Sequence, residues 1–234
     1  MESVGSVAME TVVVRMWLPD RPGALGQVAS RMGAVRGEIV GIDILERGAG
    51  RAIDELVVEL PDGSLLDLLV QEIQQVDGVD VEQVRPAADA LHDPRLDALE
   101  TAAVLVGATD RHALVRAVVE HARRGVGAEW SAVVSLAEGS VLAEEGPVPA
   151  AGWLAAFVEG SRSSARVAAG ETGPDDVVWS PLPSAGLALV VGRHGTPYRA
   201  RERRQVAALA RIVDTRLREI IRYSSLAHHP SVVR

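Results

Sequence analysis

The residues best placed for chemistry lie in one short stretch, Leu18-Pro19-Asp20-Arg21-Pro22-Gly23-Ala24-Leu25. It ends an apolar strand, turns on a Pro-Gly pair and opens a helix. The first N–H groups of a helix have no partners within it, so they can bind a carboxylate. The side chain of Asp20 can bind an ammonium group. The structural alternative is that Asp20 only caps the helix and the Pro-Gly pair only makes the turn.

The side chains that catalysis most often needs are missing or scattered. The chain has no cysteine and no lysine, which excludes thiolate nucleophiles, Schiff bases and a P-loop lysine. No serine has the spacing of a nucleophile elbow. Of the six histidines only His228 and His229 are adjacent, so a metal site is conceivable only there. We therefore expect no catalytic residues, no metal and no cofactor. An unrecognised activity near Trp130, Trp153 and Trp179 is the remaining enzymatic alternative.

The overall composition excludes further classes of function. The 234 residues carry a formal net charge of −8, which argues against a general nucleic-acid binder because phosphate contacts need a positive excess. Hydrophobic residues make up 47% of the chain, enough for proper cores, yet no apolar run is long enough to cross a bilayer. Met1 to Glu10 lacks the pattern of a secretory signal. Together with the absence of cysteine, these features predict a cytoplasmic protein.

The first half of the sequence predicts a small sandwich of strands and helices. A helix is expected to begin at Pro22, and a second helix is expected after an N-cap at Ser64. The apolar stripe of the first helix consists of Leu25, Val28, Ala29 and Met32. Strands are expected over 11–18, 38–46, 52–60 and 79–84. The resulting order β-α-β-β-α-β is typical of a ferredoxin-like sandwich.

One face of this predicted sheet is covered by the two helices. The other face carries Val13, Trp17 and Val57, which leaves it partly apolar. An exposed apolar face indicates an interaction surface. We therefore expect a homodimer, formed either sheet against sheet or edge to edge.

Residues 10–86 resemble an ACT domain. The resemblance rests on the apolar strand that runs into Asp20-Arg21-Pro22-Gly23-Ala24-Leu25 and on Gly37-Glu38-Ile39-Val40 in the second strand. ACT domains are regulatory modules that pair and bind amino acids or similar small ligands at the interface. The resemblance implies a site between the loop of one copy and the second strand of another. Its candidate residues are Asp20, Gly23, Ala24, Leu25, Glu38, Ile39 and Val40.

The charges of this candidate site bear on its ligand. Asp20 can take an ammonium group, while backbone N–H groups around Gly23 to Leu25 can take a carboxylate. Several amino-acid-binding ACT domains have asparagine or histidine where Leu18, Asp20 and Glu38 stand here. Two acids favour a cationic group and repel a carboxylate, so the class of ligand stays open.

The second half of the chain predicts a further domain over 95–223, after a polar, proline-marked linker over 87–94 and before a tail over 224–234. In its first helix the apolar residues in register are Leu96, Leu99, Ala103 and Val106. Helices are expected over 95–106, after a cap at Thr109-Asp110, over 152–160 and along a long final segment to about Tyr223. Strands are expected over 130–136, 141–144, 165–169, 177–182 and 186–192.

This order of elements resembles a GAF domain over roughly 95–222. The resemblance rests on the Gly-Ala-Glu-Trp-Ser turn at 127–131 and on the Leu-Ala-Leu-Val-Val strand at 187–191, which precedes Tyr198-Arg199-Ala200-Arg201-Glu202. GAF domains bind small molecules over their sheet or act as dimerising signal relays. The arginines of the final helix alternate with acids and read as a solvated face rather than a nucleic-acid surface. The apolar stripe of that helix can extend into a dimer seam with helix 95–106.

The sequence thus predicts an α+β protein, a ferredoxin-like βαββαβ (ACT) sandwich followed by a GAF-like antiparallel sheet with flanking helices. We expect a homodimeric, non-catalytic regulatory protein that binds a small ligand, an amino acid, at the ACT interface and relays the binding to the GAF-like domain. The alternative is a dimerising interaction adaptor that binds a protein partner and no small molecule. Neither hypothesis involves nucleic acid or a membrane.

Overall fold

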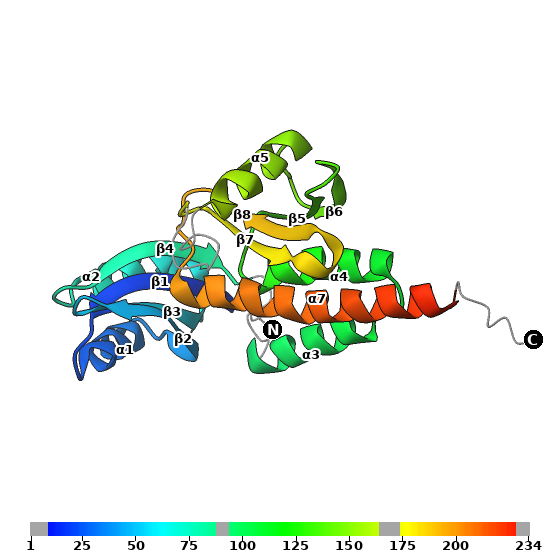
Figure 1. Cartoon of the computed structure of the whole chain (residues 1–234). Coiled ribbons are helices and arrows are strands. Elements are labelled where there is room, and N and C mark those ends of the chain that lie inside the picture. Colours follow the sequence, from blue (N-terminus) through cyan, green and yellow to red (C-terminus); the bar gives the residue numbers. More distant parts are fainter. Residues whose placement is uncertain (1–8, 88–93, 164–173, 228–234) are drawn as a thin grey trace, which may run out of the picture. The chain divides into compact units, whose positions relative to one another are not determined.

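The chain folds as an α+β protein with two antiparallel four-stranded sheets. The computed structural model describes residues 9–87, 94–163 and 174–227 (Figure 1). It divides into two compact units, unit 1 from Met1 to His92 and unit 2 from Asp93 to Arg234. Each unit has its own sheet and its own helices, and each is described here by itself. The strand predicted over 165–169, most of the linker over 87–94 and the adjacent histidines His228 and His229 lie outside the described residues.

Unit 1 has the predicted β-α-β-β-α-β order. Its sheet has the strand order β2-β3-β1-β4, and all neighbouring strands are antiparallel. A strand order with β1 and β3 in the centre is that of the ferredoxin-like sandwich. Its elements are β1 (Glu10–Pro19), α1 (Ala24–Ala34), β2 (Glu38–Gly48), β3 (Arg51–Leu60), the 3-10 turn η1 (Gly63–Leu65), α2 (Leu66–Gln74) and β4 (Asp80–Pro86).

The core of unit 1 lies between the sheet and its two helices, as the alternation of β1 predicts. Side chains at every second position of β1 and β3 pack on the stripes of α1 and α2. Among these buried residues are Val12, Val14, Met16 and Leu18 of β1, Val28 and Met32 of α1, and Leu69 and Ile73 of α2.

Two helix starts differ from the prediction. Helix α1 begins at Ala24, not at Pro22, because Gly23 adopts φ 86°, a left-handed conformation that ends the turn and that glycine enters most readily. The second helix, α2, begins at Leu66 without a side-chain cap, and Asp62, not Ser64, caps the 3-10 turn that precedes it: the Asp62 carboxylate accepts a hydrogen bond from the Ser64 N–H at 2.9 Å. An aspartate directly before a 3-10 turn can accept a hydrogen bond from a free N–H of that turn, as a serine cap would at a helix start.

The face of the sheet opposite α1 and α2 carries charges as well as apolar residues. Val13 and Val57 lie there as cross-strand partners, as predicted. Two residues further along β1 on this face, however, Arg15 forms an ion pair with Glu55 at 2.8 Å. Arg85 lies 3.6 Å from the same carboxylate. The exposed large apolar residues of the sheet are instead on the edge strand β2, where Val40, Ile42 and Ile44 are 39–49% exposed.

Unit 2 has a sheet of strand order β6-β5-β8-β7 with helices on both faces. The antiparallel sheet with flanking helices agrees with the GAF-like architecture predicted for this half. The elements are α3 (Pro94–Gly107), α4 (Arg111–Gly125), β5 (Trp130–Ser135), β6 (Val141–Glu145), α5 (Ala151–Arg162), β7 (Val177–Leu182), the 3-10 turn η2 (Pro183–Ala185), β8 (Leu187–Gly192) and α7 (Ala200–Ala227).

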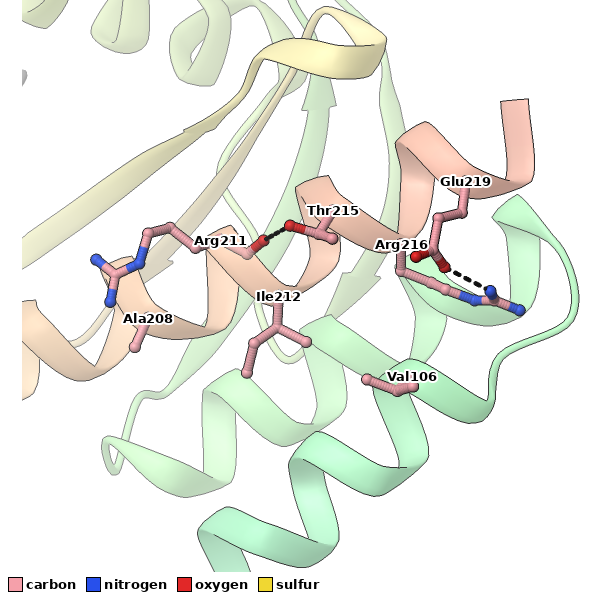
Figure 2. A pocket seen from close by; sticks show the side chains of 7 residues that line it. All are labelled: Val106, Ala208, Arg211, Ile212, Thr215, Arg216 and Glu219. Carbon is pink, nitrogen blue, oxygen red and sulfur yellow. Dashed lines mark hydrogen bonds and ion pairs between the residues drawn. The ribbon is translucent and has the colours of Figure 1, made fainter. Parts of the chain in front are cut away.

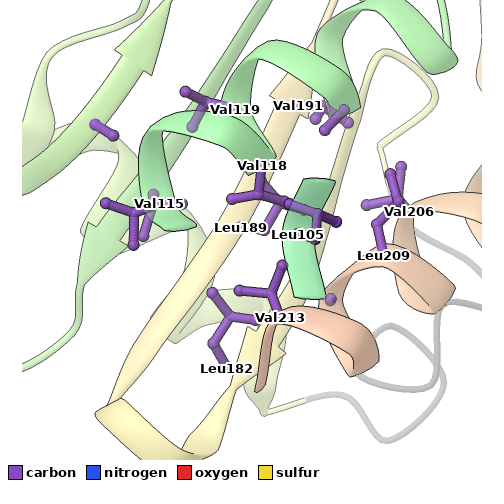
Figure 3. Packing of buried hydrophobic residues seen from close by; sticks show 14 of the residues in the cluster. Leu105, Val115, Val118, Val119, Leu182, Leu189, Val191, Val206, Leu209 and Val213 are labelled. Carbon is purple, nitrogen blue, oxygen red and sulfur yellow. The ribbon is translucent and has the colours of Figure 1, made fainter. Parts of the chain in front are cut away.

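The larger core of unit 2 lies between the sheet and α3, α4 and α7. Figure 3 shows side chains from all three helices and from β7 and β8 meeting in this layer. The opposite face of the sheet packs on α5 through a second cluster that includes Trp130 and Trp179. Strands β5 and β8 are buried along their whole length, as expected of central strands covered on both faces.

A buried ion pair fixes the start of α7. Arg193, at the end of β8, is 7% exposed and uses all five of its N–H groups. Two of them bind the Glu202 carboxylate at 2.7 and 3.0 Å, and the other three bind the carbonyls of Val126, Thr196 and Pro197. Glu202 also accepts from the Arg199 N–H at 2.7 Å, one half of a capping box.

The stripe predicted on α3 faces outward. Leu96, Leu99 and Val106 are 52%, 69% and 57% exposed, whereas Leu105, one position away from Val106, is fully buried. The spacing of the stripe was predicted correctly, but the core of unit 2 contacts a different side of the helix. The reason is that apolar residues occur on more than one side of α3, so its sequence does not distinguish the side that the core covers.

Candidate functional site

The corner between β1 and α1 brings four of the predicted site residues together. The Asp20 N–H donates to the Gly50 carbonyl at 2.9 Å, which ties the corner to the turn between β2 and β3. Asp20 and Gly23 are exposed, Leu25 is half-buried, and the side chain of Ala24 is buried in the core. A side-chain carbon added at Gly23 would have no atom within 4 Å, so the corner is open at this point.

Three backbone N–H groups of this corner are free to bind a ligand. Among the described residues, the N–H groups of Gly23, Leu25 and Gly26 donate to no carbonyl or side chain, and no side chain caps α1. The Ala24 N–H, by contrast, donates to the Arg21 carbonyl at 3.3 Å. The corner therefore has free N–H groups at the positions where the sequence analysis expects them, except at Ala24, and anion binding by these groups stays a prediction.

A carboxylate that the sequence analysis missed lies beside this corner. Asp54 is in the middle of β3, and its cross-strand partners are Met16 on β1 and Ile44 on β2. It therefore points to the helix-covered face of the sheet. The residue is only 4% exposed, and its Oδ1 atom accepts no hydrogen bond from any described residue. Its signal in the sequence is a charged residue at an inward position of an otherwise apolar strand face.

Burial and neighbouring charges act on Asp54 in opposite directions. Burial raises the pKa of this carboxyl, the positive charge of Arg47 lowers it, and the negative charge of Asp20 raises it again. Asp54 is thus within electrostatic range of both the corner and the end of β2. A buried carboxylate without a hydrogen-bond donor costs free energy, and a bound cation would remove that cost.

The other three predicted residues lie at the far end of the sheet. Glu38 and Ile39 are opposite Glu59 and Val58 of β3, level with the start of β1, and Val40 is at a bulge in the pairing. Six residues of extended β1, about 20 Å, separate this level from the corner. Within one chain the structure does not bring Glu38, Ile39 and Val40 to Asp20.

The tryptophans of unit 2 pack as structural residues. Trp130 and Trp179 are 4% and 7% exposed and fill the layer between the sheet and α5. Trp153, on α5, is half-exposed and stacks on Phe157 with the ring centroids 5.4 Å apart. Within the described ranges, no three His, Asp or Glu side chains form a group that could hold a metal ion. None of the described helices is both long and apolar enough for a membrane span.

By strand order and pairing, unit 1 is ACT-like and unit 2 is GAF-like. No protein-family model matches the chain, and neither does any curated protein. Among solved structures, the ACT domain from the GTP pyrophosphokinase of Chlorobium tepidum is 18% identical, with a TM-score of 0.28, over 34% of this chain and 99% of that one. The phytochrome photosensory core module of Stigmatella aurantiaca is 14% identical, with a TM-score of 0.39, over 96% of this chain and 63% of that one. An unknown protein from Galdieria sulphuraria is 16% identical, with a TM-score of 0.32, over 89% of this chain and 94% of that one.

Proposed function

We propose that the chain is a non-catalytic regulatory protein that binds a free amino acid at an interface between two copies of unit 1. The observation that carries the proposal is the unpaired buried oxygen of Asp54 beside the free N–H groups of the β1–α1 corner. A zwitterion fits this arrangement, because its ammonium group can bind Asp54 and Asp20 while its carboxylate binds the N–H groups of Gly23, Leu25 and Gly26.

The edge strand β2 supports pairing of two copies. No described strand pairs with its outer edge, and Val40, Ile42 and Ile44 are exposed on this strand. Unpaired edges with apolar side chains favour the addition of another strand. In the antiparallel register that is centred between Ile42 and Asp43, Glu38 of the second copy lies level with Arg47 of the first. Glu38, Ile39 and Val40 of the second copy would then approach the corner that they cannot reach within one chain.

The regulatory part of the proposal concerns unit 2. A ligand that binds between two copies stabilises the paired state, and any packing of unit 2 that depends on pairing then shifts with it. The GAF-like unit would in this way receive the signal. Catalysis has no part in the proposal, since the candidate site holds acids and backbone donors and lacks an activated nucleophile.

The test is a thermal-shift screen of the whole chain against the twenty amino acids at millimolar concentration. A ligand that binds only the folded protein stabilises it by about 2.7 kcal/mol at one hundred times its Kd, which raises Tm. We expect a shift with at least one amino acid, a strong loss of that shift in Asp54→Asn and a partial loss in Asp20→Ala.

The matched control is Asp67→Asn, which removes an exposed carboxylate from α2, away from the corner. This variant should keep the shift of the unchanged protein. If no amino acid raises Tm, or if Asp67→Asn and Asp54→Asn behave alike, the amino-acid site is wrong. The interaction adaptor then becomes the better hypothesis.

A further inference from the structure

The outer side of unit 2 has an open groove between α3 and α7. Figure 2 shows Val106 of α3 facing Ile212 of α7 across it, with Thr215 and Glu219 further along α7. The groove has a volume of about 420 Å³. Its lining residues are Val106, Ala208, Arg211, Ile212, Thr215, Arg216 and Glu219.

The exposed apolar residues of α3 continue this groove. Leu96, Leu99, Ala103 and Val106 are spaced three and four residues apart, so they form one stripe, and all four are exposed. The groove residues of α7 follow the same rule, since Ala208, Ile212, Thr215 and Glu219 are spaced four, three and four apart. Two parallel seams with heptad spacing are the surface that a pair of helices presents to another pair.

We infer that this face of unit 2 binds the same face of a second copy, with the two α7 helices antiparallel about a twofold axis at Thr215. The inference is independent of the ligand proposed for unit 1. A second copy is the occupant that fits best, because Arg211 and Glu219 of this face can pair with Glu219 and Arg211 of the same face in another copy.

The charges of α7 distinguish the two possible directions. Arg211 lies four residues before Thr215, and Glu219 lies four residues after it. In the antiparallel arrangement Arg211 of each copy lies opposite Glu219 of the other, which makes two attractive pairs. In a parallel arrangement each residue meets its own counterpart, so arginine faces arginine and glutamate faces glutamate.

The side chains concerned are available for these contacts. Arg211 is exposed and forms no ion pair or side-chain hydrogen bond with the described residues. Glu219 binds Arg216 of its own helix at 2.8 Å and is half-exposed, so it retains an oxygen for a second cation. Arg216 is held in place by the Ala108 carbonyl, which it binds at 2.9 and 3.0 Å.

Single cysteines provide the test, because the chain has none of its own. Thr215→Cys places one thiol at the proposed axis, where two copies can form a disulfide, which requires Cα atoms within about 7 Å. Ala208→Cys lies seven residues away, so in the antiparallel dimer its two thiols are about 21 Å apart along the axis. Mild oxidation of the whole chain should therefore cross-link Thr215→Cys and leave Ala208→Cys uncross-linked.

Each other pattern of cross-links overturns the inference. Cross-linking of both variants indicates parallel helices, and cross-linking of Ala208→Cys alone indicates a different axis. Cross-linking of neither variant means that no second copy binds this groove in the proposed way. Ala156→Cys, on the exposed side of α5, measures random collision and should remain uncross-linked.

Two further variants in the Thr215→Cys chain test the contacts themselves. Leu99→Glu places a charge in the apolar seam and should slow cross-linking by at least about tenfold. Leu68→Glu, the same change at an exposed position of α2, should leave the rate unchanged. Arg211→Glu should slow cross-linking, and the double change Arg211→Glu with Glu219→Arg should restore it. Equal rates in Leu99→Glu and Leu68→Glu, or no restoration by the double change, overturn the inference.

Discussion

At the scale of single residues, two positions of unit 1 set the candidate site apart from the apolar core. The carboxylate of Asp54 is buried with one oxygen unpaired, and Gly23 has a left-handed backbone at the open end of the corner. Unpaired buried polar groups often mark binding sites, because a ligand can supply the missing hydrogen-bond partner. Both positions therefore make predictions that the apolar core does not.

We expect Asp54→Asn to stabilise the protein without ligand at neutral pH. Burial raises the pKa of this carboxyl above 3.8, so the folded state binds more protons than the unfolded state just above that value. Stability contributed by the protonated form is complete below pH 3.8 and is lost as the pH rises through the folded pKa. Urea unfolding from pH 3 to 7 should show that the free energy of unfolding of Asp54→Asn exceeds that of the unchanged protein by an amount that grows with pH. A difference that is constant with pH would contradict this.

Gly23 and Gly26 form a matched pair for a test of the backbone. Both have open space where a side-chain carbon would be added, but only Gly23 has a positive φ. Gly23→Ala should therefore destabilise the protein by about 1 kcal/mol. Gly26→Ala, in the first turn of α1, should stabilise it by about 0.5–1 kcal/mol because alanine restricts the unfolded chain. Denaturant midpoints, compared where the slopes m are equal, measure the change in unfolding free energy of both variants. If both variants change stability in the same direction, alanine is not strained at position 23.

At the scale of elements, the pair Arg193–Glu202 joins the end of β8 to the start of α7. Both side chains are at least nine-tenths buried, and every N–H of the guanidinium is bound. A buried pair of this kind contributes less than its geometry suggests, but removal of one partner leaves an uncompensated charge. The start of α7 should thus be among the most sensitive points of unit 2.

Glu202→Ala should accordingly cost about 3–5 kcal/mol of unfolding free energy. Glu159→Ala removes the exposed pair with Arg162, whose atoms are 3.3 Å apart, and should change stability by less than about 0.5 kcal/mol. Chemical denaturation of the two variants measures the contrast. A small effect at Glu202 would mean that water can replace the pair.

The elements also separate what the sequence can predict from what it cannot. The alternation of β1 identified its buried face correctly, because period two leaves only two choices. The stripe of α3 was correct in spacing and wrong in direction, since spacing groups residues on a face without naming the neighbour that covers it. The start of α1 depends on the φ of Gly23, and the pair Arg193–Glu202 depends on the loop between them.

The candidate site shows the same division. Asp20 and the free N–H groups follow from a strand that turns into a helix, so local sequence predicts them. Asp54 is 34 positions further on in the sequence and reaches the corner only through the pairing of β3 with β1. Glu38, Ile39 and Val40 are close to the corner only if a second copy pairs along β2, and this stays a prediction.

At the scale of the whole molecule, two units with separate cores should unfold as separable events. Calorimetry of the full chain should then resolve two transitions, because such chains depart from two-state behaviour. Asp54→Asn should move only one of them and Glu202→Ala only the other. A single transition that both variants move equally would mean that the units are thermodynamically coupled.

In the proposed dimer, helix α7 is constrained on both of its long sides. Val206, Val213 and Leu217 face the core, while Ala208, Thr215 and Glu219 line the groove on the opposite side. Each added or deleted residue turns the rest of the helix by about 100°, which would displace both stripes at once. We therefore expect insertions and deletions in α7 to be tolerated only in blocks of about seven or eleven residues, because these lengths are close to whole numbers of helical turns and keep each later side chain on its original side.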